Sequence, residues 1–124
     1  MQDDMKLSAI YCRVACADMY ALETQRISLS RLAKLLGYGN CIEYLDNGAS
    51  GLTFERPAFS QMNADIHAGI ISFVLVKDIA RVSRDIISFQ TWINEVDKLG
   101  VTVISANGGL LSVPGYEYAA NTKF

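Results

Sequence analysis

The sequence has few of the residues that form disulfide frameworks and metal sites. It contains one histidine, His67, and three cysteines, Cys12, Cys16 and Cys41, without CxxC or CxH spacing. An odd number of cysteines without paired spacing argues against a disulfide-stapled secreted domain, and the shortage of paired ligands argues against zinc. We expect the cysteines to be small core residues of a reduced, cytoplasmic protein that holds no metal.

An excess of positive charge and a long apolar run are also missing. Lysine and arginine number 11 against 13 acids, for a net charge of −2 and a pI near 5.3. This balance argues against an overall basic nucleic-acid-binding module, although a local basic patch is compatible with it. No apolar run approaches the roughly 18 residues of a membrane span, and we see no signal pattern. What the chain does have, 51% hydrophobic and 19% charged residues, suits one compact domain with a buried core.

Apolar patterns alternate between strand and helix spacing along the chain. They predict strands over residues 6–14, 41–45, 70–76 and 101–104, and helices over 22–36, 57–68, 79–83 and 85–99. Gly37, Gly69 and Gly100 follow the three longer helices and are expected to end them. This order predicts an α/β domain of three layers, in which the sheet has four to five mainly parallel strands.

Charged residues follow three of the predicted strands. Arg13 lies at the end of the first, Asp46 at the end of the second and Lys77 at the end of the third. Because the carboxyl ends of parallel strands meet at one edge, where ligands bind, we expect these side chains to converge. The loop over residues 46–51 is weaker evidence, since turns of this composition are common and Gly48 most simply supplies a positive φ.

Arginines concentrate near the same edge. Four of the six arginines lie at strand ends or in adjacent loops: Arg13, Arg56, Arg81 and Arg84. Guanidinium groups grip phosphate oxygens with two parallel bonds, so Arg13, Arg81 and Arg84, together with Lys77, predict a phosphate-binding socket. The alternative is that the arginines form surface salt bridges with Glu55, Asp78 and Asp85.

Four segments, in this order, resemble the signature of the serine recombinases (resolvases, invertases, large integrases and transposases). Tyr11-Cys-Arg13-Val14 resembles Tyr-x-Arg-Val/Leu-Ser, and Ala21-Leu-Glu-Thr-Gln25 resembles Ser-Leu-x-x-Gln. Asp46-x-Gly-x-Ser-Gly51 with Glu55-Arg56-Pro57 is similar to the Asp-x-Gly-x-Ser-Gly…Arg-Pro segment. Val76-Lys77-Asp78-Ile-Ala-Arg81-Val-Ser-Arg84 is similar to the Val-Lys-x-Leu-[Asp/Ser]-Arg-x-x-Arg block. The resemblance runs from Tyr11 to about Gly109. The residues around Arg56-Pro57 and Val76-Lys77-Asp78 are most similar to the large, transposon-borne branch.

The resemblance implies a resolvase-like catalytic domain that cuts and rejoins DNA through a phosphoserine intermediate, with no cofactor. Cationic side chains then stabilise the pentacovalent phosphorane. By resemblance, Arg13, Arg81 and Arg84 hold the scissile phosphate, Lys77 and Arg56 support its binding, and Gln25 and Asp46 orient the site. The family also implies DNA as the partner and a homodimer or tetramer for the full-length protein.

One departure from the family pattern decides activity. The nucleophilic serine falls two residues after the strand-one arginine, where this sequence has Ala15. A methyl group cannot attack phosphorus, so we expect the chain as written not to cleave DNA. Cys16 is not expected to substitute, because its side chain should point elsewhere and a thiolate suits a phosphodiester poorly. Ala80 stands where the family often has aspartate or serine, so we expect a local hydrogen bond to be lost.

The predicted catalytic domain spans residues 1–111, and residues 112–124 lead towards a linker helix. The family's long helix and DNA-binding domain do not fit in 124 residues, so we expect both to be absent and the chain to be a fragment or a truncated product. Three origins of Ala15 stay open: an engineered knockout, a natural pseudo-recombinase or a decaying mobile-element copy. The flanking Val-Ala-Cys-Ala favours natural drift.

Two other functions stay open at this point. A non-catalytic remnant would pair with an intact recombinase protomer and regulate it through apolar residues of helix 85–99. Trp92 is a candidate contact, although core burial is its simpler role. A flavodoxin-like or receiver-like domain would instead bind a small phosphorylated ligand at the same sheet edge. Inhibition of an active relative tests the first function, and thermal stabilisation by small phosphates tests the second.

Overall fold

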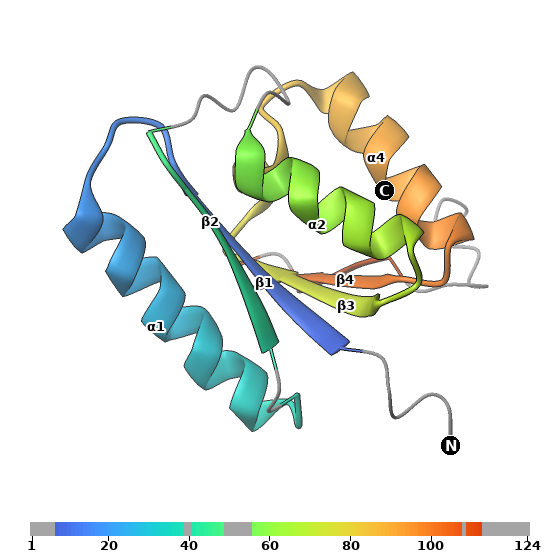
Figure 1. The fold of residues 1–124 in the computed structure, drawn as a ribbon, viewed down its shortest axis with the longest axis horizontal. Helices are drawn as coiled ribbons and strands as arrows, with labels where there is room; N and C mark the ends of the chain where they lie inside the picture. The colour runs from blue at the N-terminus through green and yellow to red at the C-terminus, as the bar shows by residue number, and fades with distance from the viewer. Residues whose placement is uncertain (1–6, 39–40, 49–55, 108, 113–124) are drawn as a thin grey trace.

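The computed structural model describes residues 7–38, 41–48, 56–107 and 109–112. Strands and helices alternate along the chain as the apolar patterns predict (Figure 1). The strands are β1 (Leu7–Val14), β2 (Cys41–Asn47), β3 (Ile71–Val76), β4 (Thr102–Ser105) and β5 (Gly109–Ser112). The helices are α1 (Met19–Leu35), α2 (Pro57–His67), α3 (Ile79–Val82) and α4 (Ile86–Lys98).

The strands form one sheet in the order β2-β1-β3-β4-β5. The first four are parallel and β5 pairs antiparallel with β4. Parallel strands need covered crossovers, which the intervening helices supply. The predicted α/β class with four to five mainly parallel strands is confirmed. The carboxyl ends of β1, β2 and β3 therefore lie along one edge.

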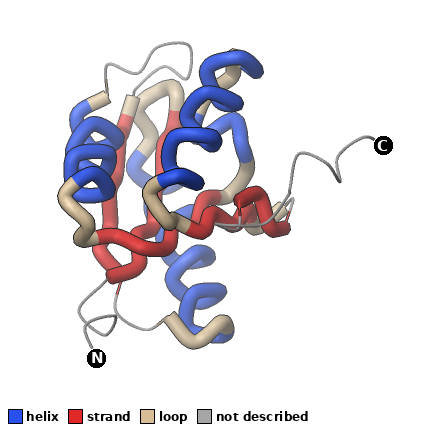
Figure 2. Tube along the Cα trace, turned by 90° about the vertical axis from the view of Figure 1, so that its right-hand side faces the viewer, coloured by secondary structure: helices blue, strands red, loops and turns tan. Residues whose placement is uncertain are grey.

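Helices cover the sheet on both faces, which gives the predicted three layers (Figures 1 and 2). On one face, α1 packs on β1 and β3 through Ile10, Cys12, Leu22, Leu29, Ala33, Phe73 and Leu75. On the other face, α2 and α4 pack through a larger cluster that includes Tyr11, Phe59, Met62, Val74, Val76, Trp92 and Val96. Because successive strand residues point to opposite faces, neighbours such as Tyr11 and Cys12 belong to different cores.

The three longer helices end in the same way, at a glycine with positive φ. After α1, the Gly37 N–H bonds the Lys34 carbonyl at 3.1 Å and the Tyr38 N–H bonds the Ala33 carbonyl at 2.8 Å. Gly37 has φ +91°, a conformation in which a Cβ atom would be strained. This pair of bonds is a Schellman motif, and the same pattern recurs at Gly69 and Gly100. The predicted helix ends are confirmed.

Several predicted boundaries differ from the structure. Helix α1 begins at Met19, three residues before the predicted start, because the Asp18 carboxylate accepts the Ala21 N–H at 3.1 Å and caps it. Strand β2 continues to Asn47, so Asp46 lies in a strand and not in the predicted loop. Gly48 has the expected positive φ, +87°. Most of the predicted tail, residues 113–124, lies outside the described residues.

Candidate functional site

The residue in the predicted nucleophile position, Ala15, directly follows β1 and is exposed. Cys16 and Ala17 are also exposed and lead to the α1 cap at Asp18. Strand β1 lies between β2 and β3 in the sheet. Residue 15 is therefore presented to solvent at the carboxyl edge, two residues beyond Arg13.

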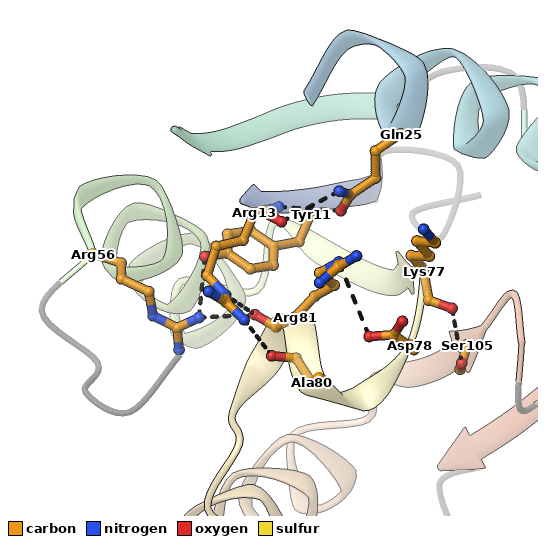
Figure 3. Close-up of polar contacts among 9 residues, drawn as sticks. All are labelled: Tyr11, Arg13, Gln25, Arg56, Lys77, Asp78, Ala80, Arg81 and Ser105. Atoms are coloured by element: carbon orange, nitrogen blue, oxygen red, sulfur yellow. Dashed lines mark hydrogen bonds and ion pairs between the residues drawn. The ribbon is translucent and has the colours of Figure 1, made fainter. Parts of the chain in front are cut away.

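Gln25 fixes the end of β1 from α1. Its Oε1 accepts the Arg13 backbone N–H at 3.1 Å, and its Nε2 donates to the Arg13 carbonyl at 3.2 Å (Figure 3). The side chain is 6% exposed. A buried side-chain amide that bonds both the N–H and the carbonyl of one residue fixes that residue as a neighbouring strand would. Gln25 thus sets the position of the backbone that leads into Ala15.

Two buried arginines hold the short helix α3 by its carbonyl groups. The Arg13 guanidinium donates from Nε to the Arg81 carbonyl at 3.0 Å and from Nη2 to the Ala80 carbonyl at 2.6 Å. Arg56 donates from Nη1 to the Arg81 carbonyl at 2.8 Å (Figure 3) and from Nη2 to the Val82 carbonyl. The carbonyls of a helix's last turn lack partners in the helix and carry partial negative charge, so the two cations complete that turn.

The pKa values of both arginines are lowered, mainly by burial. The neighbouring guanidinium of Arg56 lowers the pKa of Arg13 further, and Arg81 and Arg84 act in the same direction. Around Arg56, the Tyr11 hydroxyl and the Asp46 carboxylate oppose this lowering. Like charges therefore do gather at this edge, as the arginine pattern predicts, and together they attract an anion.

The more accessible cations of this group are Arg81 and Arg84. Arg84 is exposed, whereas the Arg81 side chain is 24% exposed and its Nε lies 4.0 Å from Asp78 Oδ1. At that distance the two side chains form an ion pair but no hydrogen bond. Of the predicted salt bridges, this one is present. Asp85 instead accepts from the Ser88 N–H and hydroxyl and caps α4, and Glu55 lies outside the described residues.

Asp46 links three elements of the site. Its Oδ2 accepts the Tyr11 hydroxyl at 2.8 Å and the Phe59 N–H at 3.0 Å, and its Oδ1 accepts the Ala58 N–H at 3.0 Å. The carboxylate thus caps α2, whose own N-cap residue, Arg56, makes no side-chain cap. Tyr11 also accepts from Arg56 Nη1 at 3.2 Å, which joins the carboxylate to the arginines.

Tyr11 is a site residue that the sequence reasoning did not assign a role. Burial and its bond to Asp46 raise the pKa of the hydroxyl, so it stays protonated as a donor. Its ring packs edge-on against Phe59, with centroids 5.2 Å apart. A tyrosine inside an apolar strand needs a partner for its hydroxyl, and that need was the signal available in the sequence.

Lys77 lies apart from the buried arginine pair. It follows β3 and lines a cavity with residues of α1, on the opposite side of the sheet from Tyr11 and Val76. The strand period of two explains this, since Cys12 and Leu75 also point to the α1 face. Of the three strand-end residues predicted to converge, Arg13 and Asp46 are register partners, and Arg56 lies near them. The prediction is wrong for Lys77, whose side chain lies on the α1 face.

No described helix has both the length and the apolar content to cross a membrane. No group of three or more His, Cys, Asp or Glu side chains among the described residues is arranged to hold a metal ion.

The chain is similar to recombinases in sequence and in structure. Residues 8–121 match the family described as Resolvase, N terminal domain. A candidate DNA recombinase of Bacillus subtilis (strain 168) is 31% identical over 108 residues, which cover 86% of this chain and 21% of that protein. The N-terminal catalytic domain of TP901-1 integrase superposes with a TM-score of 0.75 at 30% identity, over 84% of this chain and 79% of that one.

A resolvase family site-specific recombinase from Streptococcus pneumoniae gives a TM-score of 0.76 at 26% identity, over 92% of this chain and 80% of that one. The similarity therefore covers most of the chain at the level of fold. The chain spans about a fifth of the length of its curated relative.

Proposed function

The chain belongs to the resolvase N-terminal domain family, and we propose that it is the catalytic domain of a site-specific serine recombinase whose nucleophile position holds Ala15. The observation that carries the proposal is the placement of residue 15. It is exposed at the carboxyl end of β1, beyond an arginine whose backbone Gln25 holds from α1. Pre-positioned backbone next to clustered cations is what attack on a phosphodiester requires.

In this proposal two arginines contact the phosphate and two position the backbone. Arg81 and Arg84 contact the scissile phosphate, because they are the more accessible of the four. Arg13 and Arg56 are positioning residues, since their guanidinium groups grip the carbonyls of α3 and fix the backbone that carries Arg81. Their buried charges add to the positive potential at the edge.

The remaining site residues support this arrangement. Gln25 positions the end of β1, and Asp46 positions Tyr11 and the start of α2. Lys77 contacts the DNA strand from the α1 side. The Ala80 carbonyl accepts from Arg13, while its methyl side chain supplies no polar group to the site. With a serine at position 15, the hydroxyl oxygen would lose its proton and form a bond to phosphorus, while the bond from phosphorus to the 3′-oxygen would break. The products are a 5′-phosphoserine link and a 3′-hydroxyl, which takes up one proton for the one that the serine loses.

DNA as the partner, assembly of the full-length protein into a homodimer or tetramer, the transposon-borne branch and a cytoplasmic location are parts of the same proposal. The chain's relatives by name include a candidate DNA recombinase and an integrase. The DNA recombinase extends far beyond the part that matches this chain, and we place most of the phosphate contacts that give DNA affinity in such additional segments. The weakly negative net charge of this chain, −2, agrees with that division.

The test restores the nucleophile with Ala15→Ser. The variant is made in the longest reading frame that contains this chain and is incubated with a pool of random-sequence duplexes. We expect a covalent protein–DNA adduct that survives SDS, and release of the DNA by alkali, since phosphoserine undergoes elimination. The unchanged chain and the double variant Ala15→Ser, Arg84→Ala are the controls. Sequencing the trapped duplexes would show the site.

If Ala15→Ser folds like the parent and yields no adduct over the pool, the claim that only the nucleophile is missing is wrong. Adduct formation that is insensitive to Arg84→Ala would instead remove Arg84 from the phosphate site. An adduct from the unchanged chain would point to Cys16, which is exposed beside Ala15.

A regulatory role is a second candidate, and the surface of α4 favours it. Ile86 and Ile87, at the start of α4, are 67% and 72% exposed and form an apolar pair that a partner protein would cover on binding. Trp92 lines a pocket with Ile87 but, at 7% exposed, contributes little area to this surface. It is buried, its indole N–H donates to Asn63 Oδ1 at 2.8 Å, and its ring packs on Phe59. Loss of recombination by an active relative, on mixing, would support the role, and Ile87→Asp should abolish that loss.

A further inference from the structure

The cavity that Lys77 lines lies on the α1 side of the sheet edge. One face of α1 provides Tyr20, Thr24 and Ser28, the end of β3 provides Lys77, and the turn after β4 provides Asn107. The cavity has a volume of about 380 Å³, within the range of small-ligand sites. The spacing of the three α1 residues, four apart, places them in one row along the helix.

The lining has a definite chemical character. Lys77 is the one charged group among the nine lining residues, and none of the nine is acidic. Among the described residues, Lys77 forms no salt bridge, and the hydroxyls of Thr24 and Ser28 form no hydrogen bond with another residue. The backbone N–H of Asn107 donates to the Lys77 carbonyl at 3.0 Å, and its side-chain amide is available to a ligand.

The rim of the cavity carries an exposed aromatic ring. Tyr20 is 83% exposed, although its neighbour in the same helix, Leu22, is buried in the core. The cavity floor is apolar at Leu29. A cation, hydroxyl and amide donors, and a flat aromatic surface form the combination that proteins use for nucleotides, in which the phosphate, the sugar and the base each find a partner.

The cavity is distinct from the arginine cluster yet close to the same strand ends. Gln25 is shared between them, since it lines the cavity and also holds the backbone of Arg13. Both atoms of its side-chain amide bond the Arg13 backbone, so Gln25 lines the cavity but has no free polar group for a ligand. A DNA strand that crosses the edge at Ala15 would therefore place a neighbouring nucleotide over α1.

We propose that the cavity is a subsite for one unpaired nucleotide of the DNA strand, with its phosphate on Lys77 and its base against Tyr20. This inference rests on the proposed function for the identity of the ligand as DNA. Thr24, Ser28 and Asn107 bond the sugar and the base edge. The subsite selects a single-stranded segment, because stacking on Tyr20 requires a base that is free of its complementary strand.

The full chain is titrated with four probes: a single-stranded thymidine trinucleotide, thymidine 5′-monophosphate, inorganic phosphate and a blunt duplex. Binding is followed by calorimetry and by backbone amide NMR shifts. We expect the trinucleotide to bind most tightly and to shift the amides of Thr24, Ser28 and Asn107. Lys77→Met and Tyr20→Ala should each weaken its binding about ten-fold, Tyr20→Phe should retain it, and the exposed control Lys34→Met should leave it unchanged.

Equal affinity of the parent, Lys77→Met and Tyr20→Ala for the trinucleotide would overturn the subsite, as would shifts confined to the surroundings of Arg84. Binding of the free monophosphate as tight as that of the trinucleotide would replace the DNA strand by a free nucleotide as the ligand. The two proposals fail separately. An Ala15→Ser adduct without these binding losses removes only the subsite, and trinucleotide binding at Lys77 without an adduct removes only the recombinase activity.

Discussion

Replacing Arg56 by lysine keeps the positive charge beneath α3 and removes the fork that carries its hydrogen bonds. Arg56 is 1% exposed and donates to the Tyr11 hydroxyl at 3.2 Å, to the Arg81 carbonyl at 2.8 Å and to the Val82 carbonyl. A lysine ammonium at the end of a flexible chain can satisfy one of these acceptors in place. The Arg81 carbonyl keeps its bond from Arg13, so the main loss falls on Val82 and Tyr11.

The cost follows from those two lost bonds. A hydrogen bond from a charged donor contributes about 1.5–3 kcal/mol, and a bond to a hydroxyl that keeps another partner contributes less. We therefore expect Arg56→Lys to lower the free energy of unfolding by about 2–3 kcal/mol. For a domain of this size, with a urea m-value of about 1–3 kcal/mol/M, the midpoint falls by on the order of 1–2 M. Arg56→Met, which also removes the charge, should cost about 3–5 kcal/mol.

The assay is urea unfolding followed by far-ultraviolet circular dichroism, with intrinsic fluorescence of Trp92 as a second probe. The matched control is Arg31→Lys on the exposed face of α1, which should change stability by less than about 0.5 kcal/mol. An Arg56→Lys midpoint as close to the parent as that of the control would refute the reasoning, because it would mean that the charge alone holds α3.

Other perturbations test separate parts of the structure. Burial raises the pKa of Cys12 to about 12, so a thiol reagent at pH 8 should modify exposed Cys16 within minutes and Cys12 only on unfolding; early modification of Cys12, seen by peptide mass spectrometry, would contradict its place in the core. Asp46→Asn removes one acceptor and the charge that caps α2, and should cost about 1–2 kcal/mol in urea unfolding; an unchanged midpoint would argue against the cap. His67 lies 2.7 Å from Glu95, and its bonds to Asn63 and Glu95 raise its pKa. The stabilisation is therefore present below the unfolded pKa of about 6.5 and is lost as the pH rises through the higher folded value, so His67→Gln should lower Tm at pH 6 and have little effect at pH 9; an equal effect at both would exclude the ion pair.

The candidate site was predictable where sequence pattern and topology agree. Arg13 and Asp46 end neighbouring parallel strands and pair in register, so their proximity follows from the order of elements. The departure at Ala15 was also visible, because the residue two positions after Arg13 can be read from the chain alone. The roles of Arg13 and Arg56 were not predictable in this way. Their partners are backbone carbonyls of α3, and carbonyls carry no sequence signal.

Lys77 shows a different limit. Its place at the end of β3 was correct, yet the strand period sends its side chain to the α1 face while Arg13 extends to the other. Two residues predicted to lie at the same edge of a sheet can still point to opposite faces, because a shift of one residue along a strand reverses the direction of the side chain. The sequence also did not predict that Tyr20 lines the same cavity as Lys77, because this depends on how α1 packs on the sheet.

By itself, the sequence determined the α/β class, the parallel order of the first four strands, the glycine helix ends and the absence of a hydroxyl at position 15. These depend on local periodicity, on backbone conformation and on residue identity, all of which are properties of short segments. The tertiary structure alone decided which cations are buried and which are accessible, that Asp46 caps α2, and that a cavity containing Lys77 opens beside α1. Those features arise from contacts between residues far apart in the chain, such as Arg13 with Arg81, and from the burial that such contacts create.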